Sequence, residues 1–115
     1  MSVLDDNIAK LDSHLKQFRE VGILNCIAGD YVAGSNGTFQ TNSPVDKSII
    51  CDVAHGSTED IDRAANAAQE AFSTWREMPA LERKEVLIRI ADGIEARAEE
   101  IALCECWDTG QAYKF

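Results

Sequence analysis

Residues 49–68, IICDVAHGSTEDIDRAANAA, decide the fold, because a strand pattern changes there into a helix pattern. Residues 49–54 are rich in β-formers and predict a strand, which His55 and Gly56 close. Residues 57–60 then provide an N-cap hydroxyl and acidic side chains, both of which stabilise the start of a helix. This junction predicts a fold of the α/β class.

After the junction the chain is predicted to be helical. The first apolar stripe consists of Ile61, Ala64, Ala65, Ala68, Phe72 and Trp75, and the second consists of Leu87, Ile90, Ala91, Ile94 and Ala98. Pro79 suits the first position of the helix that carries the second stripe. The pattern shifts phase near residues 96–97, which predicts a third helix over residues 98–108 with Gly110 as its stop. The sequence therefore predicts two to three helices here.

Before the junction the chain is predicted to form short strands. Residues 25–32 carry β-formers around a central Gly29-Asp30, which predicts a tight hairpin. Residues 33–37 predict a loop, and residues 38–41 predict a short extended run. Residues 43–47 predict a turn, in which the proline fixes φ.

The first twenty or so residues predict an amphipathic helix that ends at Gly22. Leu4, Ile8, Leu11, Leu15 and Phe18 are spaced so that they fall on one helix face. Such a helix either packs on its own protein or binds a partner. The stripe is short for a coiled coil, which favours packing within the protein.

Charge and composition exclude several classes of protein. The 115 residues contain 11 Lys and Arg against 20 Asp and Glu, a formal net charge of −9. This balance argues against nucleic-acid partners and against anionic membranes. No run is long and apolar enough for a membrane span, and acidic residues stand where a secretory signal carries positive charge. The sequence therefore predicts a cytoplasmic protein with no membrane and no nucleic-acid partner.

No active site emerges from the residues themselves. The four cysteines, Cys26, Cys51, Cys104 and Cys106, are expected to be reduced thiols that pack in the fold. The last two lie two positions apart on a predicted helix, so they point to nearly opposite sides and cannot easily share a metal. Residues 34–37 contain the paired glycines, but no helix follows them, which predicts a hairpin loop rather than a phosphate-binding loop.

The order of several segments resembles the N-terminal opening of the NAD(P)-dependent aldehyde dehydrogenase superfamily. These segments are residues 27–32, 39–46, 49–54, 59–64, 71–72 and 75, the positions 83, 87, 91 and 94, and residues 105–111. Ser43 stands where the family commonly has Asn, Tyr31 where it has Trp, and Lys47 where it has a turn glycine. Lys47 must therefore avoid a positive φ or accept strain. The turn at residues 43–46, the N-terminal helix and residues 108–111 resemble those of enzymes that oxidise semialdehydes from aromatic catabolism, of which the 5-carboxymethyl-2-hydroxymuconic semialdehyde dehydrogenases are one example.

The resemblance implies that this chain is an incomplete portion of a Rossmann-type cofactor domain. Residues 1–22 form an N-terminal helical extension, and residues 23–115 form a truncated N-terminal part of the NAD-binding domain. A full-length member oxidises an aldehyde to a carboxylic acid with NAD or NADP, through a nucleophilic cysteine. It is a homo-oligomer that takes a small-molecule aldehyde. The family's catalytic and nucleotide-binding motifs lie downstream of residues 108–111, so this chain is expected to hold none of them and to be inactive alone.

One family site is implied within the chain. Many members hold a structural sodium or potassium ion near an aspartate that matches Asp108 and a backbone oxygen that matches Thr41. Hard cations favour such oxygen ligands. The alternative is that Asp108 caps local backbone N–H groups. A third ligand would lie beyond Phe115, so the chain alone is expected to bind the ion weakly.

A second function remains open from the sequence. The N-terminal helix and the alanine-lined helices also suit a non-catalytic interaction module, or a decayed gene product, that docks on a partner subunit. The sequence does not distinguish NAD from NADP, and it does not identify the aldehyde.

Overall fold

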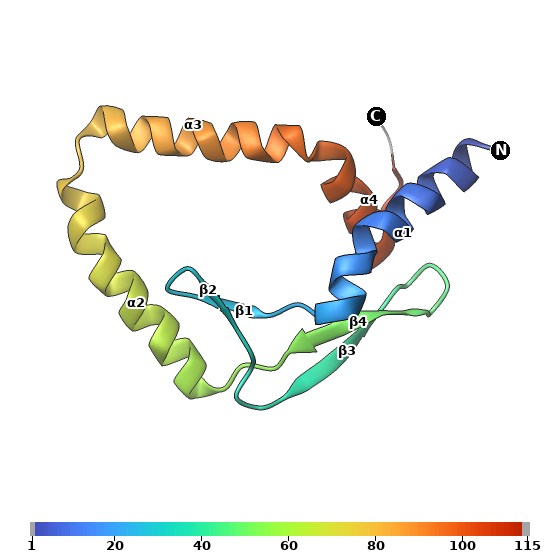
Figure 1. Cartoon of the computed structure of the whole chain (residues 1–115), viewed down its shortest axis with the longest axis horizontal. Helices are drawn as coiled ribbons and strands as arrows, with labels where there is room; N and C mark the ends of the chain where they lie inside the picture. The colour runs from blue at the N-terminus through green and yellow to red at the C-terminus, as the bar shows by residue number, and fades with distance from the viewer. Residues whose placement is uncertain (1, 114–115) are drawn as a thin grey trace. The chain divides into compact units, whose positions relative to one another are not determined.

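The computed structural model describes residues 2–113 as four helices and four short strands (Figure 1). The helices are α1 (Val3–Val21), α2 (Thr58–Glu77), α3 (Ala80–Ala96) and α4 (Ala98–Thr109), and the strands are β1 (Asn25–Ile27), β2 (Asp30–Val32), β3 (Thr38–Asn42) and β4 (Ile49–Ala54). The predicted α/β class and order of elements are confirmed. The described part of the chain contains no helix that is long and apolar enough to cross a membrane.

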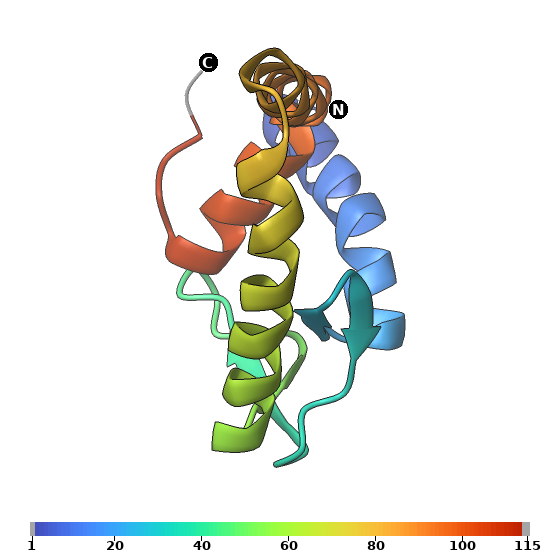
Figure 2. The ribbon, with the colours of Figure 1, turned by 90° about the vertical axis from the view of Figure 1, so that its left-hand side faces the viewer.

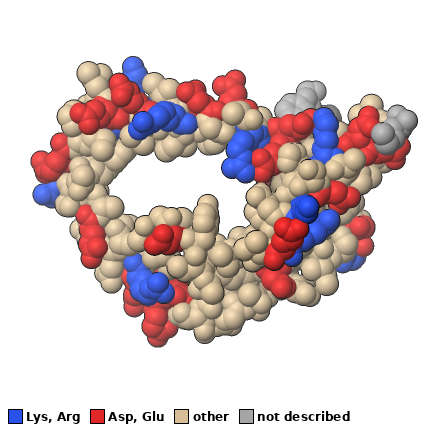
Figure 3. Space-filling view, viewed as in Figure 1, with Lys and Arg blue, Asp and Glu red and all other residues tan. Residues whose placement is uncertain are grey.

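The chain divides into two units. The first unit contains α1, β3, most of β4, and α4, and the second contains β1, β2, α2 and α3. Acidic side chains, with basic ones among them, are spread over the face shown in Figure 3. This arrangement agrees with an acidic, solvated surface.

The core of the first unit joins α1, β4 and α4. Its buried residues are Leu11, Leu15, Ile50, Cys51 and Leu103, and Phe18, Val53, Cys104, Trp107 and Tyr113 pack against them. The C-terminal half of the α1 stripe is therefore buried in its own protein, as favoured from the sequence. Val3 and Leu4, at the start of α1, remain 77% and 66% exposed. Lys10 on α1 forms an ion pair with Glu99 on α4, which adds a polar contact beside the core.

Both ends of α1 follow from local chemistry. Ser2 accepts a hydrogen bond from the Asp5 backbone N–H, and the Asp5 carboxylate accepts one from the Ser2 backbone N–H, which forms a capping box. At the other end Gly22 has a φ of +79°, and a Cβ there would lie 2.9 Å from the Asp52 carbonyl oxygen. The predicted stop at Gly22 is confirmed, and it depends on the absence of a side chain.

β3 and β4 pair across the predicted turn. Ser43 at the start of that turn is fully buried, and its hydroxyl donates a 2.6 Å hydrogen bond to the Trp107 carbonyl oxygen on α4. Lys47 adopts a φ of +68°, so it accepts the left-handed conformation rather than avoiding it. The turn is thus fixed to α4 by a serine at the position where Asn was expected.

Two predictions about the second unit need correction. The β1–β2 hairpin turns at Ala28 and Gly29, which both have positive φ, while Asp30 pairs with Ile27 inside the ladder. Positive φ at both central positions is the geometry of a type I′ turn, so the turn lies one residue earlier than predicted. The segment 34–37 is not a hairpin loop, because β2 and β3 belong to different sheets.

The start of α2 is held by a buried carboxylate (Figure 2 shows α2 in front). Asp60 is 3% exposed and accepts hydrogen bonds from the Ser35 N–H and hydroxyl, both at 2.8 Å, and from the Ser57 N–H at 3.0 Å. These hydrogen bonds, with Arg63 nearby, lower the pKa of Asp60 to about 2. Ser57 completes the predicted N-cap by accepting from the Asp60 N–H.

The segment 34–37 also lies close against the backbone that follows β4. A Cβ on Gly34 would lie 2.3 Å from the His55 carbonyl oxygen. Asn36 N–H donates to that same oxygen, and His55 N–H donates to the Gly37 carbonyl oxygen. Gly34 is therefore required for this close approach, and not for binding a phosphate.

The predicted stripes of α2 and α3 are largely exposed. α3 contains no buried residue, and Leu87, Ile90 and Ile94 are 59%, 54% and 57% exposed. Pro79 precedes α3 instead of occupying its first position, and its carbonyl oxygen accepts the N–H of Arg83. α4 begins and ends as predicted, within one residue, and Gly110 after it has a φ of +76°.

Candidate functional site

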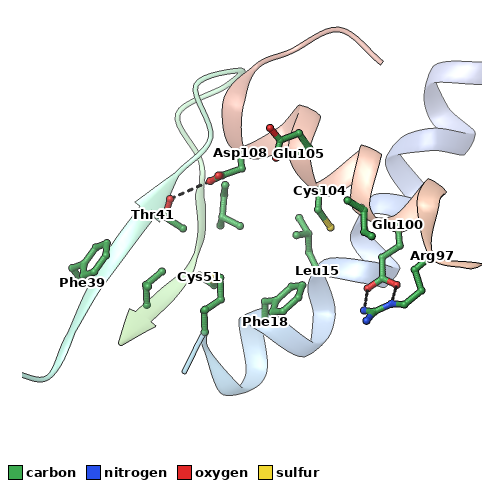
Figure 4. Close-up of a pocket in the computed structure, with 14 residues that line it drawn as sticks. Leu15, Phe18, Phe39, Thr41, Cys51, Arg97, Glu100, Cys104, Glu105 and Asp108 are labelled. Atoms are coloured by element: carbon green, nitrogen blue, oxygen red, sulfur yellow. Dashed lines mark hydrogen bonds and ion pairs between the residues drawn. The ribbon is translucent and has the colours of Figure 1, made fainter. Parts of the chain in front are cut away.

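Thr41 and Asp108, far apart in the sequence, lie side by side in the first unit. Thr41 is on β3 and Asp108 is in the last turn of α4, and the Thr41 hydroxyl donates a 3.4 Å hydrogen bond to the Asp108 carboxylate (Figure 4). The oxygen that approaches Asp108 is therefore the hydroxyl, whereas the resemblance implied the backbone oxygen. Residues 2–113 contain no group of three or more His, Cys, Asp or Glu that would hold a metal.

The pair stands at one end of an apolar groove of about 530 Å³. We call it the α1–α4 groove. It is lined by Leu15, Phe18, Ile23, Phe39, Thr41, Ile50, Cys51, Val53, Arg97, Glu100, Ile101, Cys104, Glu105 and Asp108 (Figure 4). α1 and β4 supply its most deeply buried residues, since Leu15 and Cys51 are 3% and 4% exposed. All of its lining residues belong to the first unit.

One wall of the groove contains an ion pair between Arg97 and Glu100. The Arg97 guanidinium donates two hydrogen bonds to the Glu100 carboxylate, at 2.6 and 2.8 Å. These hydrogen bonds lower the pKa of Glu100. The Glu100 charge is thus already balanced within the protein.

The thiols in the groove are not activated. Burial raises the pKa of the Cys51 thiol, and the charges of Asp52 and Asp108 raise it further. Burial, followed by the charge of Glu100, likewise raises the pKa of the Cys104 thiol. A nucleophilic cysteine needs the opposite shift, so the prediction that these two pack in the fold is supported. Cys26 is exposed on β1, Cys106 is half-buried on α4, and all four are free thiols.

The described residues do not fit a dinucleotide. A phosphate-binding loop must open a helix, but the segment 34–37 leads into β3. At the start of α2, the Ser57 N–H donates to the Asp60 carboxylate and the Asp60 N–H donates to the Ser57 hydroxyl, so these two backbone groups are already used within the protein.

The resemblance pointed to Thr41 and Asp108, which lie side by side, but two contacts that hold the fold were not predicted. The first joins Ser35 to Asp60. Asp60 also bonds to Ser57, and only that bond has a local sequence signal, the capping-box spacing. The second joins Ser43 to Trp107, and no spacing rule links residues so distant. The α1–α4 groove was also missed, because its lining comes from four separate elements.

Comparison of the sequence with known proteins identifies one family. The sequence profile of the Aldehyde dehydrogenase family matches residues 31–115. The chain is 42% identical over 91 residues to benzaldehyde dehydrogenase, mitochondrial, from Antirrhinum majus, and 38% identical over 91 residues to acetaldehyde dehydrogenase from Pseudomonas aeruginosa. These matches cover 76% and 78% of this chain, but only 17% and 18% of the relatives.

Solved structures give the same result. HpcC from Thermus thermophilus is 38% identical, with a TM-score of 0.85 over 90% of this chain and 20% of that chain. Betaine aldehyde dehydrogenase from Staphylococcus aureus, solved in complex with NAD+, is 28% identical, with a TM-score of 0.80 over 89% of this chain and 21% of that chain. The chain therefore corresponds to about a fifth of these structures.

Proposed function

Because this chain belongs to the aldehyde dehydrogenase family, we propose that it is the N-terminal section of an enzyme that oxidises an aldehyde to a carboxylic acid with NAD or NADP. The observation that carries the proposal is the family match over residues 31–115, supported by the fold shared with HpcC. The Staphylococcus aureus relative, solved with NAD+, supports the choice of cofactor.

Within this enzyme the chain supplies framework rather than chemistry. Residues 1–22 act as a helical extension, and residues 23–115 form the first part of the NAD-binding domain. The raised thiol pKa values of Cys51 and Cys104 support a packing role for these two cysteines rather than a catalytic one. The assembled enzyme is a cytoplasmic homo-oligomer, although two plant relatives are described as mitochondrial.

The substrate we propose is a semialdehyde from the breakdown of aromatic compounds. Support comes from the turn at residues 43–46, the N-terminal helix and the segment 108–111, which are similar to those of the semialdehyde dehydrogenases named above. The structural match to HpcC covers 90% of the chain. The family profile covers less of it, because the profile begins at residue 31 and leaves out α1.

The function is tested with a chimaera in which residues 1–115 replace the matching fifth of Thermus thermophilus HpcC. We expect the chimaera to fold and to form reduced nicotinamide when aldehyde and NAD or NADP are added, because this section is structurally equivalent. The natural Thermus enzyme is the positive control. A folded chimaera with no activity toward any aldehyde that the Thermus enzyme oxidises would contradict the proposal.

The 115-residue chain on its own provides the complementary measurement. We expect it to form no reduced nicotinamide with any aldehyde, since the described residues include neither a dinucleotide loop nor an activated cysteine. Absorbance of the reduced cofactor is the readout. Measurable turnover by the purified chain would overturn the assignment of a non-catalytic role.

We also propose that Thr41 and Asp108 contribute two oxygen ligands to a structural monovalent cation. Their 3.4 Å approach supports this, although the resemblance implied a different Thr41 oxygen. In the chimaera, replacing potassium chloride by tetramethylammonium chloride should lower the melting temperature, and Asp108→Asn should remove that dependence. Equal cation dependence in the natural sequence and the variant would exclude the pair as ligands.

A further inference from the structure

We propose that Asn36 and Gly37 form a site of spontaneous covalent modification, at which Asn36 loses ammonia and becomes aspartate or isoaspartate. The fold keeps this site unreactive through hydrogen bonds to Gly34 and to the segment 55–56. The site lies within the second unit. It goes beyond the proposed function, because its chemistry involves no aldehyde and no nicotinamide.

The chemistry needs only these two residues and water. The Gly37 backbone nitrogen gives up its proton and attacks the side-chain carbonyl carbon of Asn36, so that a new N–C bond closes a succinimide ring. The bond from that carbon to Nδ2 breaks, and ammonia leaves with the proton. Water then opens the ring at either carbonyl, so the products are aspartate and isoaspartate, and nothing is oxidised or reduced.

Sequence and exposure select Asn36 over the other asparagines. Asn36 is followed by glycine, whose missing side chain leaves the attacking nitrogen uncrowded. Asn36 is also exposed, and a Cβ on Gly37 would meet nothing within 4 Å, so water has access to the site. The asparagines that precede residues with a side chain are Asn7, Asn25, Asn42 and Asn66.

The structure holds both reacting groups in other hydrogen bonds. The Gly37 N–H donates a 3.1 Å hydrogen bond to the Gly34 carbonyl oxygen, and the Asn36 side-chain amide donates a 3.4 Å hydrogen bond to the Gly56 carbonyl oxygen. The first bond must break before the nitrogen loses its proton, and the second must break before the side chain turns to Gly37. The reaction therefore proceeds from a locally opened loop, whose population depends on the stability of the loop.

The main chain on both sides of the site is paired with one residue. Asn36 N–H donates to the His55 carbonyl oxygen at 3.0 Å, and His55 N–H donates to the Gly37 carbonyl oxygen at 2.8 Å. These bonds fix the segment between β2 and β3 beside the chain that leads into α2 (Figure 1). Isoaspartate inserts an extra carbon into the main chain between the two bonds, so their spacing no longer matches His55. Aspartate keeps the main chain but has no N–H for the Gly56 oxygen.

Conversion of Asn36 also affects the start of α2. The preceding residue, Ser35, donates from its N–H and its hydroxyl to the buried Asp60 carboxylate. A loop that has lost its pairing with His55 no longer holds Ser35 in place, so Asp60 loses two of its donors. The modified chain is therefore expected to be less stable in its second unit.

The test follows each asparagine of the 115-residue chain by peptide mapping with mass spectrometry, at mildly alkaline pH, in native buffer and in guanidinium chloride. In guanidinium chloride Asn36 should convert fastest, with aspartate and isoaspartate both formed, and Asn42 is the internal control. In native buffer the conversion of Asn36 should be slower by about tenfold or more, because only the open loop reacts. Circular dichroism checks the helices in each buffer.

Variants test whether the hydrogen bonds of the loop give the protection. Gly34→Ala, whose new Cβ would lie 2.3 Å from the His55 carbonyl oxygen, should raise the native rate about fivefold or more and leave the denatured rate unchanged. Gly93→Ala on α3, where a Cβ meets nothing within 4 Å, is the matched control and should change neither rate. Ser35→Ala removes only the hydroxyl bond to Asp60, so it serves if Gly34→Ala fails to fold, and it should raise the native rate severalfold.

A second pair of variants tests the effect of the product. Asn36→Asp introduces the carboxylate without the altered main chain, whereas Asn36→Gln keeps a side-chain amide and closes a ring far more slowly. In a Trp107→Phe background, Trp75 fluorescence should report a lower unfolding midpoint for Asn36→Asp than for Asn36→Gln. Asn36→Gln should also abolish the modification at this position.

The inference is overturned if Asn36 converts no faster than Asn42 in guanidinium chloride, if folding does not slow its conversion, or if neither loop variant raises the native rate. Aspartate without isoaspartate would exclude the succinimide ring, and equal midpoints for Asn36→Asp and Asn36→Gln would exclude the effect on α2. None of these results depends on aldehyde oxidation. Failure of the proposed function would appear instead as an inactive, folded chimaera.

Discussion

Both units of this chain contain helices with apolar stripes, but only the first unit buries them in a core of its own. In the first unit, Leu15 on α1 and Leu103 on α4 are buried in a common core. In the second unit, α3 also carries an apolar stripe, less sharply separated from its polar face, and buries none of it. An amphipathic pattern thus predicts that a helix forms, but burial also requires a partner surface within reach.

The largest expected effect is a difference in stability between a substitution in the α1 stripe and one in the α3 stripe. Leu15→Ala should lower the free energy of unfolding of the first unit by about 2–5 kcal/mol, because it leaves a cavity in the core. Leu87→Ala on α3, where the side chain is 59% exposed, should change it by no more than about 0.5 kcal/mol. Urea unfolding followed by far-UV circular dichroism measures both. Equal losses would show that α3 is also packed in solution.

Two glycines of the second unit differ in the space around them, and alanine substitutions at both should have opposite effects on stability. Gly34→Ala should destabilise the loop before β3 by about 1–3 kcal/mol, because the new Cβ would overlap the His55 carbonyl oxygen. Gly93→Ala on α3 meets nothing within 4 Å and should stabilise the helix by about 1 kcal/mol. Thermal unfolding of both variants checks the opposite signs. A neutral Gly34→Ala would disprove the close approach.

A smaller effect concerns pH and the start of α2. The folded-state pKa of Asp60 is about 2, below its ordinary value of 3.8, so its ionised form stabilises the folded state. This contribution is complete above the ordinary pKa and is lost as the pH falls from about 4 through about 2. Trp75 on α2 and Trp107 on α4 report the two units separately by single-tryptophan fluorescence.

The control for this pH effect is Asp60→Asn. The variant should be less stable than the natural chain at neutral pH, and the Trp75 signal should lose most of its dependence on pH between about 4 and 2. The Trp107 signal should be unaffected by the substitution. A Trp75 profile that is unchanged in Asp60→Asn would exclude this carboxylate as the source.

Local signals predicted much of the fold. The Ser57 cap, the Gly22 and Gly110 stops and the β4 strand depend on neighbouring residues, and the structure confirms them. The turn at Ala28 was misplaced by one residue, because alanine rarely adopts the positive φ that it has here.

The candidate site was only partly predictable. A resemblance identified Thr41 and Asp108, but no local pattern shows that β3 and the end of α4 meet. The hydrogen bond by which the Ser43 hydroxyl fixes the turn to α4 could not be predicted either, since its partner is a backbone oxygen on a helix distant in the sequence. Such contacts depend on how elements pack, which helix and strand periodicities do not encode.

The sequence alone determined the order of elements, because capping residues, turns and periodic stripes act over a few neighbouring positions, and the order of its segments carried the resemblance to the aldehyde dehydrogenase family. The tertiary structure decided which stripes are buried, brought Thr41 to Asp108, and opened the α1–α4 groove between segments distant in the chain. The physical reason is that burial and long-range hydrogen bonds depend on the surface opposite each residue, and that surface is set by packing.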